Sequence, residues 1–180
     1  MKATGIVRRI DDLGRVVIPK EIRRTMRIRE GDPLEIYTEK DGEVIFKKYS
    51  PMGELGEFAN QICEVMHKTT NQITAITDRD SIISVSGAPR RDLNERRISS
   101  DLEQVMEGRQ PYQKQLSERE MPLTDSESAY RVAIAVPIIS AGDVMGCVVF
   151  INTDASTPTG EVENKLALTV AKFLGKQMEG

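Results

Sequence analysis

The sequence has few of the residues that build metal sites and disulfide frameworks. It contains two cysteines, Cys63 and Cys147, which lie far apart, and one histidine, His67. Neither cysteine has the spacing of a zinc ligand or of a disulfide framework, and no second histidine is present to pair with the first. The sequence therefore predicts no metal and no cofactor. It also shows no nucleophile with a nearby base, so we do not expect an enzyme.

Long hydrophobic runs are also absent. No stretch approaches the roughly 18 apolar residues that a membrane span requires, and the first residues, MKATGIVRRIDD, contain no apolar signal-peptide core. We therefore expect a cytoplasmic protein without a membrane partner. The composition, with 39% hydrophobic and 29% charged residues, is typical of a globular protein, and 180 residues allow one large domain or two small ones.

Charge is distributed unevenly along the chain. Residues 1–29 hold nine basic and three acidic side chains, a net charge of +6, although the whole chain has a net charge of −3. A compact basic end on an acidic chain favours a polyanionic partner at that end. Charge alone leaves open the alternative of a solvated cationic face.

The first 50 residues predict short strands with one helix between them. Turn residues at 11–14 and an Asp-Gly pair at 41–42 separate the β-branched stretches, and Pro19 suits the first position of a helix because it lacks an N–H group. The predicted strands are 4–9, 15–18, 34–37 and 44–46, and the predicted helix is 20–27. A segment this short, with few large apolar side chains, cannot build an adequate core alone. We therefore expect it to fold only as an intertwined dimer.

The rest of the chain predicts a second domain of the α+β class. Residues 51–55 are expected to be a linker, and 56–180 a mostly antiparallel sheet with flanking helices. The predicted strands are 73–77, 82–85, 132–136 and 144–151, of which the last is apolar throughout and therefore central. The predicted helices are 54–70, one opened by a capping box at Ser100–Glu103, and one starting at Thr157-Pro158. The apolar stripe of the last helix is Val162, Leu166, Val170, Phe173 and Leu174.

Arginine outnumbers lysine six to two between residues 2 and 27. Its planar guanidinium suits bidentate contacts with phosphate oxygens and guanine edges. Arg23 and Arg27 share a face of the predicted helix, with Arg24 beside them. Double-stranded DNA is therefore the expected partner. Any single arginine has an alternative role, an ion pair with one of the nearby carboxylates Asp11, Asp12 and Glu21.

The segments TGIVR, LGRVVIP, EIRR and GDPLEI make residues 1–50 resemble the AbrB-type transition-state regulators of spore-forming bacteria. The resemblance implies a β-rich, swapped-hairpin domain in which two chains form one DNA-binding dimer. It also implies a nucleoid-associated transcriptional regulator, both activator and repressor, of sporulation genes, which reads DNA largely by shape. The family's DNA-contacting arginines fall on Arg8, Arg15, Arg23 and Arg24. Secondary candidates are Lys2, Arg9, Lys20 and Arg27.

The same N-terminal fold also occurs in antitoxins, which regulate their own synthesis and bind a toxin partner. This is the alternative function that the resemblance leaves open. An antitoxin usually ends in a short disordered tail that wraps the toxin, whereas residues 54–180 are expected to be folded. We therefore favour the transcriptional regulator.

The order of elements in residues 56–180 resembles a GAF domain. The resemblance implies a pocket for a small-molecule ligand, of unknown identity, between the sheet and its covering connections. Four arginines in one connection would attract an anion there, or are solvated and balanced by nearby carboxylates, which we favour; they are Arg90, Arg91, Arg96 and Arg97. In GAF regulators the flanking helices often form a dimer interface. Two separate interfaces would join intertwined dimers into a homotetramer, a dimer of dimers, although a simple dimer stays possible on sequence grounds.

The remaining reactive side chains are interpreted as structural. Cys63 lies on a predicted helix and Cys147 in an apolar strand, where a cysteine is usually an inert small hydrophobe. The cysteine arrangement of GAF proteins that reduce methionine sulfoxide is absent. His67, near the end of a predicted helix, is expected to cap that end or to lie on the surface.

Overall fold

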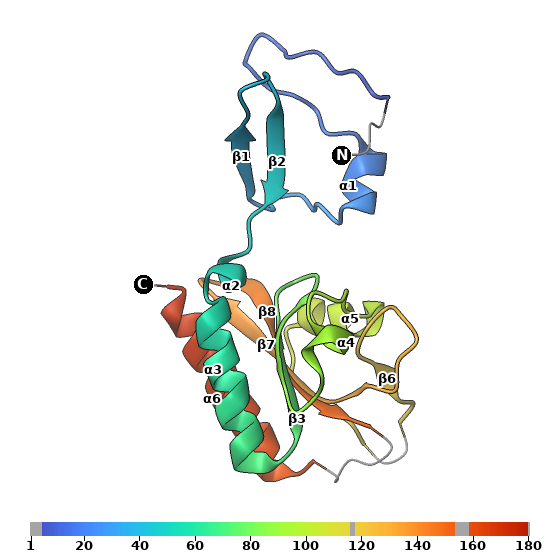
Figure 1. Ribbon diagram of the computed structural model, residues 1–180, viewed down its shortest axis with the longest axis vertical. Coiled ribbons are helices and arrows are strands. Elements are labelled where there is room, and N and C mark those ends of the chain that lie inside the picture. The colour runs from blue at the N-terminus through green and yellow to red at the C-terminus, as the bar shows by residue number, and fades with distance from the viewer. Residues whose placement is uncertain (1–4, 116–117, 154–158, 180) are drawn as a thin grey trace. The chain divides into compact units, whose positions relative to one another are not determined.

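The chain divides into two units, Met1–Tyr49 and Ser50–Gly180, drawn in Figure 1. The computed structural model describes residues 5–115, 118–153 and 159–179. The first unit contains helix α1 (Lys20–Thr25) and strands β1 (Leu34–Thr38) and β2 (Val44–Lys48). The second unit contains a six-stranded sheet and its helices.

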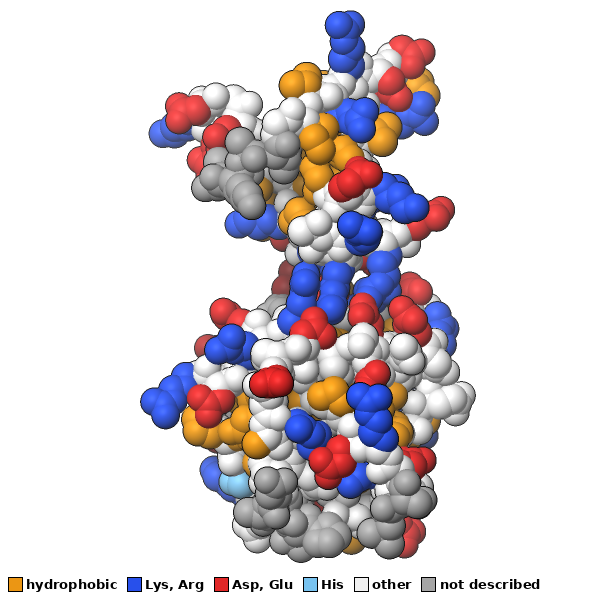
Figure 2. Space-filling model, turned by 90° about the vertical axis from the view of Figure 1, so that its right-hand side faces the viewer, with side chains coloured by type: hydrophobic (Ala, Val, Ile, Leu, Met, Phe, Trp, Pro, Cys, Tyr) orange, Lys and Arg blue, Asp and Glu red, His pale blue; other side chains and the backbone are white. Residues whose placement is uncertain are grey.

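Residues 5–18 form no strand, although the sequence predicts two strands there. A strand forms only beside a second strand, and the described part of a single chain offers none to this segment. Six apolar side chains of the segment are exposed, whereas Ile18 is half-buried. The exposed ones are Ile6, Val7, Ile10, Leu13, Val16 and Val17. Figure 2 shows exposed hydrophobic side chains among the basic ones on this unit. Thr4, where the first predicted strand begins, lies outside the described residues.

Helix α1 is two residues shorter than predicted. Pro19 is the residue directly before the helix rather than its first residue, and no side chain of the helix is buried. The helix ends before Arg27, whose backbone adopts the left-handed conformation with φ of 51°. A non-glycine residue in this region does not continue a right-handed helix, so the chain turns away at this point.

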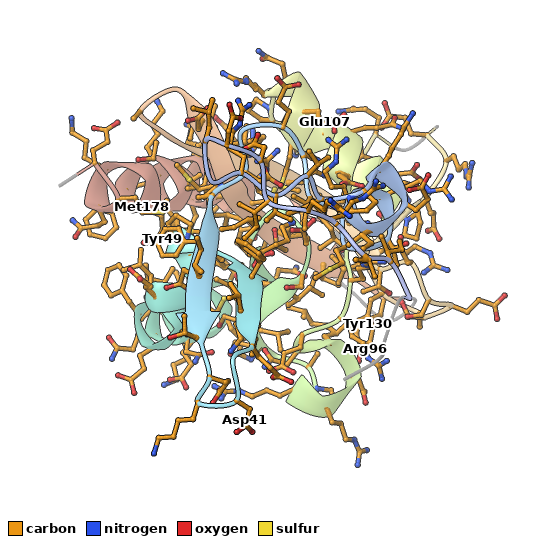
Figure 3. All side chains as sticks on the ribbon, turned by 90° about the horizontal axis from the view of Figure 1, so that it is seen from above. Asp41, Tyr49, Arg96, Glu107, Tyr130 and Met178 are labelled. Carbon is orange, nitrogen blue, oxygen red and sulfur yellow. The ribbon has the colours of Figure 1, made fainter. Side chains whose placement is uncertain are left out.

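Strands β1 and β2 form the antiparallel hairpin that the sequence predicts. Leu34 lies opposite Lys48 and Thr38 opposite Val44. The turn contains Gly42 with φ of 82°, the left-handed conformation that favours glycine. Asp41 lies at the tip of the hairpin (Figure 3). Four apolar side chains of the hairpin are exposed: Ile36, Tyr37, Val44 and Phe46.

The second unit is built on an antiparallel sheet with the strand order β4-β3-β8-β7-β5, and β6 also pairs with β7. The first two strands and the two long ones are β3 (Ile73–Thr77), β4 (Ile82–Ser86), β7 (Arg131–Ser140) and β8 (Asp143–Asn152). The two short strands are β5 (Tyr112–Gln113) and β6 (Met121–Pro122). The central position of β8, predicted from its continuous apolar run, is confirmed.

Helices cover both faces of this sheet (Figure 1). On one face lie α3 (Gly56–Thr70) and α6 (Glu161–Gln177), whose apolar residues pack with Phe150 and other sheet residues in one core. On the other face lie α4 (Arg90–Leu93) and α5 (Ser100–Gly108), which share a second core with the sheet. The unit is therefore of the predicted α+β class, with helices flanking an antiparallel sheet, and the helices form a layer on each face.

The segment expected to be a linker is in part a helix of the second unit. Helix α2 spans Pro51–Glu54, and its Met52 is fully buried in the core beneath α3 and α6. Ser50 caps α2, because its Oγ accepts the N–H of Gly53 at 3.2 Å. The same hydroxyl donates to Asp78 Oδ2 at 3.1 Å. These contacts attach residues 50–54 to the second unit.

Helix α6 faces its sheet with part of the predicted stripe and with small residues. Leu174 of the stripe is buried, and Leu166 and Val170 are partly buried against the same core. Val162 and Phe173 of that stripe are exposed. The buried residues of the helix are Ala167, Ala171, Leu174 and Gly175. A side chain at Gly175 would collide with the backbone carbonyl oxygen of Ile139, so the close approach of helix and sheet selects small residues. The predicted start at Thr157-Pro158 lies outside the described residues.

Helix α5 begins where the capping pattern predicts, within one residue. Its cap is Ser99 instead of Ser100, since Ser99 Oγ accepts the N–H of Leu102 at 3.1 Å. The side chain of Ser99 is also buried, which a search for the capping pattern alone does not reveal.

Candidate nucleic-acid interface

The four arginines expected to contact DNA lie on two segments of the first unit. Arg8 and Arg15 lie on either side of the turn that contains Gly14, and Arg23 and Arg24 lie on α1. All four side chains are exposed. Exposure leaves their guanidinium groups accessible to a polyanion.

The secondary candidates differ in their exposure. Arg9 and Lys20 are exposed, whereas Arg27 is half-buried. Lys2 lies outside the described residues. Arg27 is therefore held more closely by the protein than the other described candidates.

The turn between Arg8 and Arg15 is fixed by Asp11. The N–H of Asp11 donates to the carbonyl oxygen of Arg15 at 3.0 Å, and the N–H of Gly14 donates to the carbonyl oxygen of Asp11 at 3.0 Å. The Asp11 carboxylate also accepts the backbone N–H groups of Leu13 at 3.0 Å and of Arg15 at 2.8 Å. An aspartate that accepts backbone N–H groups two residues further on is the Asx turn expected of this residue type.

Asp11 also binds the side chain of Arg15. The Nε of Arg15 lies 2.8 Å from Asp11 Oδ2, while 69% of the arginine side chain stays exposed. The hydrogen bonds from the backbone N–H and the guanidinium of Arg15 hold the pKa of Asp11 below its ordinary value. The alternative considered for single arginines, an ion pair with Asp11, is therefore present at Arg15, and the guanidinium nevertheless stays accessible.

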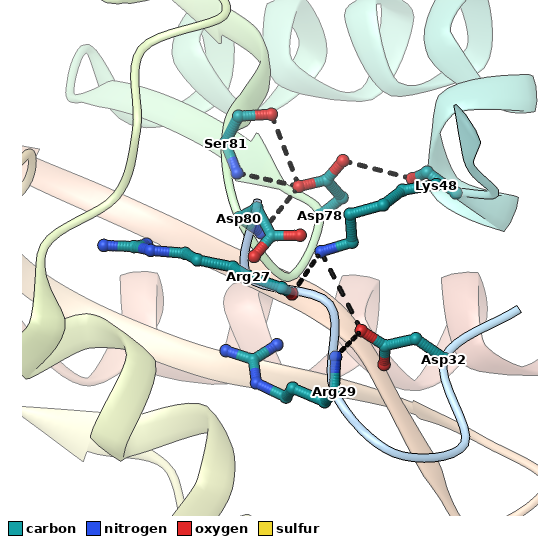
Figure 4. Close-up of polar contacts among 8 residues, drawn as sticks. Arg27, Arg29, Asp32, Lys48, Asp78, Asp80 and Ser81 are labelled. Atoms are coloured by element: carbon teal, nitrogen blue, oxygen red, sulfur yellow. Dashed lines mark hydrogen bonds and ion pairs between the residues drawn. The ribbon is translucent and has the colours of Figure 1, made fainter. Parts of the chain in front are cut away.

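The end of α1 is tied to the β1–β2 hairpin by polar contacts that the sequence does not indicate (Figure 4). Lys48 Nζ donates to the carbonyl oxygen of Arg27 at 2.9 Å and lies 3.9 Å from Asp32 Oδ2. The same Oδ2 accepts the N–H of Arg29 at 2.8 Å. These bonds fix α1, and hence Arg23 and Arg24, relative to the hairpin. Lys48 and Arg27 lie 21 positions apart, and a carbonyl acceptor carries no sequence signal.

The outer surface of α3 and α6 contains an apolar groove of about 320 Å³. Phe58 and Phe173 meet across it with ring centroids 5.9 Å apart. Phe173 and Val65 are among its exposed residues. The lining consists of Phe58, Gln61, Ile62, Val65, Met66, Leu166, Thr169, Val170 and Phe173. An exposed apolar groove between two helices is typical of an interface.

The sequence matches known families in both units. The family model described as stage V sporulation protein T C-terminal, transcription factor, matches residues 54–179. The model described as antidote-toxin recognition MazE, bacterial antitoxin, matches residues 7–53. Stage V sporulation protein T of Bacillus subtilis (strain 168) is 48% identical over 179 residues, which are 99% of each chain. The chain belongs to the stage V sporulation protein T family.

Two solved structures are similar to parts of this member of the stage V sporulation protein T family. The N-terminal DNA recognition domain of the Bacillus subtilis regulator AbrB, a solution structure, is 63% identical and covers 28% of this chain and 94% of that chain, with a TM-score of 0.25. The GAF domain of an Acinetobacter phosphoenolpyruvate-protein phosphotransferase is 12% identical and covers 73% of this chain and 84% of that chain, with a TM-score of 0.53. The second likeness shows that the second unit has a GAF-like fold.

The connection between β4 and α5 in this family member has its arginines on the surface. Arg90, Arg91, Arg96 and Arg97 are all exposed, and Arg91 Nε lies 3.5 Å from Asp92 Oδ1. The apolar residues of the same connection, Leu93 and Ile98, are fully buried against the sheet. This arrangement agrees with the solvated interpretation of the four arginines.

The cysteines and the histidine of this family member occupy structural positions. Cys63 and Cys147 are free and buried. Burial raises the pKa of Cys63 to about 11 and also raises the pKa of Cys147. His67 Nδ1 forms a hydrogen bond of 2.7 Å with the carbonyl oxygen of Gln72, just beyond the end of α3.

Neither a metal cluster nor a membrane span occurs in the described part of the chain. Within residues 5–115, 118–153 and 159–179, no three potential ligands among His, Cys, Asp and Glu gather as a metal site would require. In the same ranges, each helix is too short or too polar to cross a membrane.

Proposed function

We propose that this chain is a DNA-binding transcriptional regulator of sporulation genes, an activator and repressor that holds double-stranded DNA with an intertwined N-terminal dimer. The arginines that bind DNA are Arg8, Arg15, Arg23 and Arg24. The observation that carries the proposal is that exposed arginines and exposed apolar side chains occur together on a unit whose first segment forms no strand alone. The family is one of transcription factors. A relative described as a DNA recognition domain is 63% identical to 28% of the chain.

The exposed apolar surface of the first unit supports the intertwined dimer. Burial of a Val, Leu or Ile side chain contributes about 1.5–3 kcal/mol. The exposed side chains of residues 5–18 and of the hairpin together offer on the order of 10 kcal/mol or more per chain when a second chain covers them. Burial of these side chains is the main favourable contribution. It opposes a cost of about 4–15 kcal/mol for lost translational and rotational freedom and the further cost of ordering the segment.

The arginines support duplex DNA as the partner. An intertwined dimer presents each of the four arginines twice, and an arginine that neutralises a phosphate releases a counterion. Eight such contacts predict that the logarithm of the affinity falls with the logarithm of the salt concentration with a slope of about −7. A dimer that relies on phosphates in this way reads DNA largely by shape and deformability.

The second unit is proposed to control assembly or to sense a signal. On this proposal the first unit, up to about residue 50, is the DNA-binding domain, and the rest of the chain, which begins with α2, is the GAF-like domain. A second copy packed on the apolar α3–α6 groove joins two intertwined dimers into a homotetramer. A small-molecule ligand of the GAF-like domain stays part of the proposal, and so does a cytoplasmic, nucleoid-associated location.

The test compares two arginine variants of the full-length protein. Arg23→Ala should weaken binding to a duplex by about 1–3 kcal/mol, the value of a bidentate contact, and make the salt slope shallower. Arg91→Ala removes the same charge from an exposed position of the second unit and should change neither quantity. Fluorescence anisotropy at several salt concentrations measures both. Unchanged affinity of Arg23→Ala together with a lower melting temperature would assign Arg23 to structure.

The alternative, an antitoxin that binds a toxin partner, has one observation in its favour. The antitoxin family model matches residues 7–53. Residues 54–179, however, match the transcription-factor model, and they form a folded sheet with helices rather than a tail. The transcriptional regulator is therefore the function that we favour.

A further inference from the structure

We propose that Asp11 is a positioning residue for Arg15 and fixes which edge of the Arg15 guanidinium meets DNA. The proposal rests on the DNA-binding function proposed above. Its basis is that the two oxygens of the Asp11 carboxylate bind different groups. Oδ1 accepts hydrogen bonds from the backbone N–H groups of Leu13 and Arg15, and Oδ2 accepts one from Nε–H of Arg15 at 2.8 Å. One oxygen shapes the turn and the other holds the side chain.

The chemistry of the guanidinium gives this contact a direction. A guanidinium has N–H groups on Nε and on two terminal nitrogens, arranged in a planar fork. Because Nε of Arg15 is bonded to Asp11, the edge that includes Nε is occupied. The contact leaves the two terminal nitrogens as the pair that is free for a bidentate contact with guanine O6 and N7 or with a phosphate, and 69% of the side chain is exposed.

The contact also lowers the entropic cost of binding. An exposed arginine has several rotatable bonds, and each rotamer-rich side chain that binding immobilises weakens the affinity. Arg15 is held at two points of its own residue by Asp11, at the backbone N–H and at Nε. The guanidinium therefore meets DNA already oriented.

The competing interpretation treats Asp11 only as a negative charge beside DNA. A carboxylate close to phosphates repels them, so its removal would then raise the affinity. The neighbouring Asp12 distinguishes the two interpretations. It carries the same charge, is exposed, and makes no hydrogen bond or ion pair in the part of the chain that the structure describes.

The experiment uses the full-length protein and two duplexes of equal length. One is enriched from a random-sequence pool by the wild-type protein, and the other is the unselected pool. Asp11→Asn keeps an oxygen for the two backbone N–H groups but removes the charge that holds Nε of Arg15, so the turn is retained and the ion pair is lost. Asp12→Asn is the control for charge. Equal melting temperatures of the three proteins establish that the comparison concerns binding.

We expect Asp11→Asn to bind the selected duplex about 3- to 10-fold more weakly, while its affinity for the unselected pool does not fall. Asp12→Asn should bind both duplexes as tightly as the wild type or slightly more tightly. In an Arg15→Ala background, Asp11→Asn should have no further effect on the selected duplex, because the side chain that it positions is gone.

Three results would overturn the proposal. If Asp11→Asn bound DNA more tightly than the wild type, and as tightly as Asp12→Asn, then Asp11 would act only as a negative charge that repels DNA. A loss that persists in the Arg15→Ala background would show that Asp11 acts through the backbone turn alone. If Arg15→Ala bound the selected duplex as tightly as the wild type does, Arg15 would not contact DNA, and the proposal would be wrong. Loss of duplex binding by the wild type itself would instead contradict the proposed function.

Discussion

At the scale of single residues, Ser99 fixes the start of α5 with two hydrogen bonds. Its Oγ accepts the N–H of Leu102 at 3.1 Å and donates to the carbonyl oxygen of Pro122 at 2.6 Å. We expect Ser99→Ala to lower the free energy of unfolding by about 1–2 kcal/mol, because both partners lose a bond in a buried site. Ser100→Ala, one position along and exposed, should change it by less than about 0.5 kcal/mol. Urea unfolding measures both values, and equal losses would contradict the role of Ser99.

The two cysteine residues give a second prediction at this scale. The thiolate is the reactive form of a thiol, and burial raises the pKa of Cys63 to about 11 and that of Cys147 as well. At pH 8 only about one Cys63 in a thousand is therefore a thiolate. We expect neither thiol to react with iodoacetamide in the native protein, and both to react in urea. Mass spectrometry counts the labels, and rapid labelling of the native chain would show that a thiol is accessible.

At the scale of elements, the contact between α6 and its sheet depends on Gly175. A Cβ at this position would collide with the carbonyl oxygen of Ile139. We expect Gly175→Ala to destabilise the protein by about 1–3 kcal/mol of overpacking, reduced by at most about 1 kcal/mol of improved helix propensity. Gly108→Ala, in α5, is the matched control, because a Cβ there meets no atom within 4 Å. Urea unfolding should show a loss for the first variant and none for the second.

Elements that depend on their own side chains were predictable from the sequence. The β1–β2 hairpin follows from Asp41-Gly42, and the central place of β8 follows from its apolar run. Residues 5–18 were not predictable in the single chain, since a strand requires a neighbour. The face of α6 was predicted only in part. Leu174 is buried as expected, but the alanines and the glycine beside it were missed, because closeness to the sheet, which hydrophobicity does not measure, selects them.

The candidate site, too, has features that the sequence predicts and features that it does not. Unequal charge and helical spacing indicate a basic patch, and the resemblance to AbrB-type regulators selects Arg8, Arg15, Arg23 and Arg24 within it. All four side chains are exposed. The contacts that hold them were harder to predict. Asp11 was one of three carboxylates within reach of an arginine, and the sequence does not choose among them. The bond from Lys48 to the carbonyl oxygen of Arg27 joins distant parts of the chain through a backbone atom.

At the scale of the whole molecule, the α3–α6 groove predicts how many chains the assembly contains. Val65 lies in this groove and is 63% exposed, so a charge there leaves the fold of one chain intact. We expect the wild type to have the mass of four chains in light scattering and Val65→Glu the mass of two, with duplex binding retained. Gln104→Glu places the same charge on the exposed surface of α5 and should not alter the mass. If Val65→Glu still had the mass of four chains, the groove would not be part of the interface between dimers.

The exposed apolar segment of residues 5–18 has a consequence for how the regulator responds to its own abundance. On the proposed function, a single chain lacks the surface that binds DNA, because the intertwined dimer forms it. While encounters are scarce, the number of paired chains grows with the square of the number synthesised, so a doubling of synthesis gives about a fourfold rise in active protein. On the proposed function, the response of the target genes to the amount of regulator is therefore steeper than proportional, and this steepness comes from the way the first residues fold.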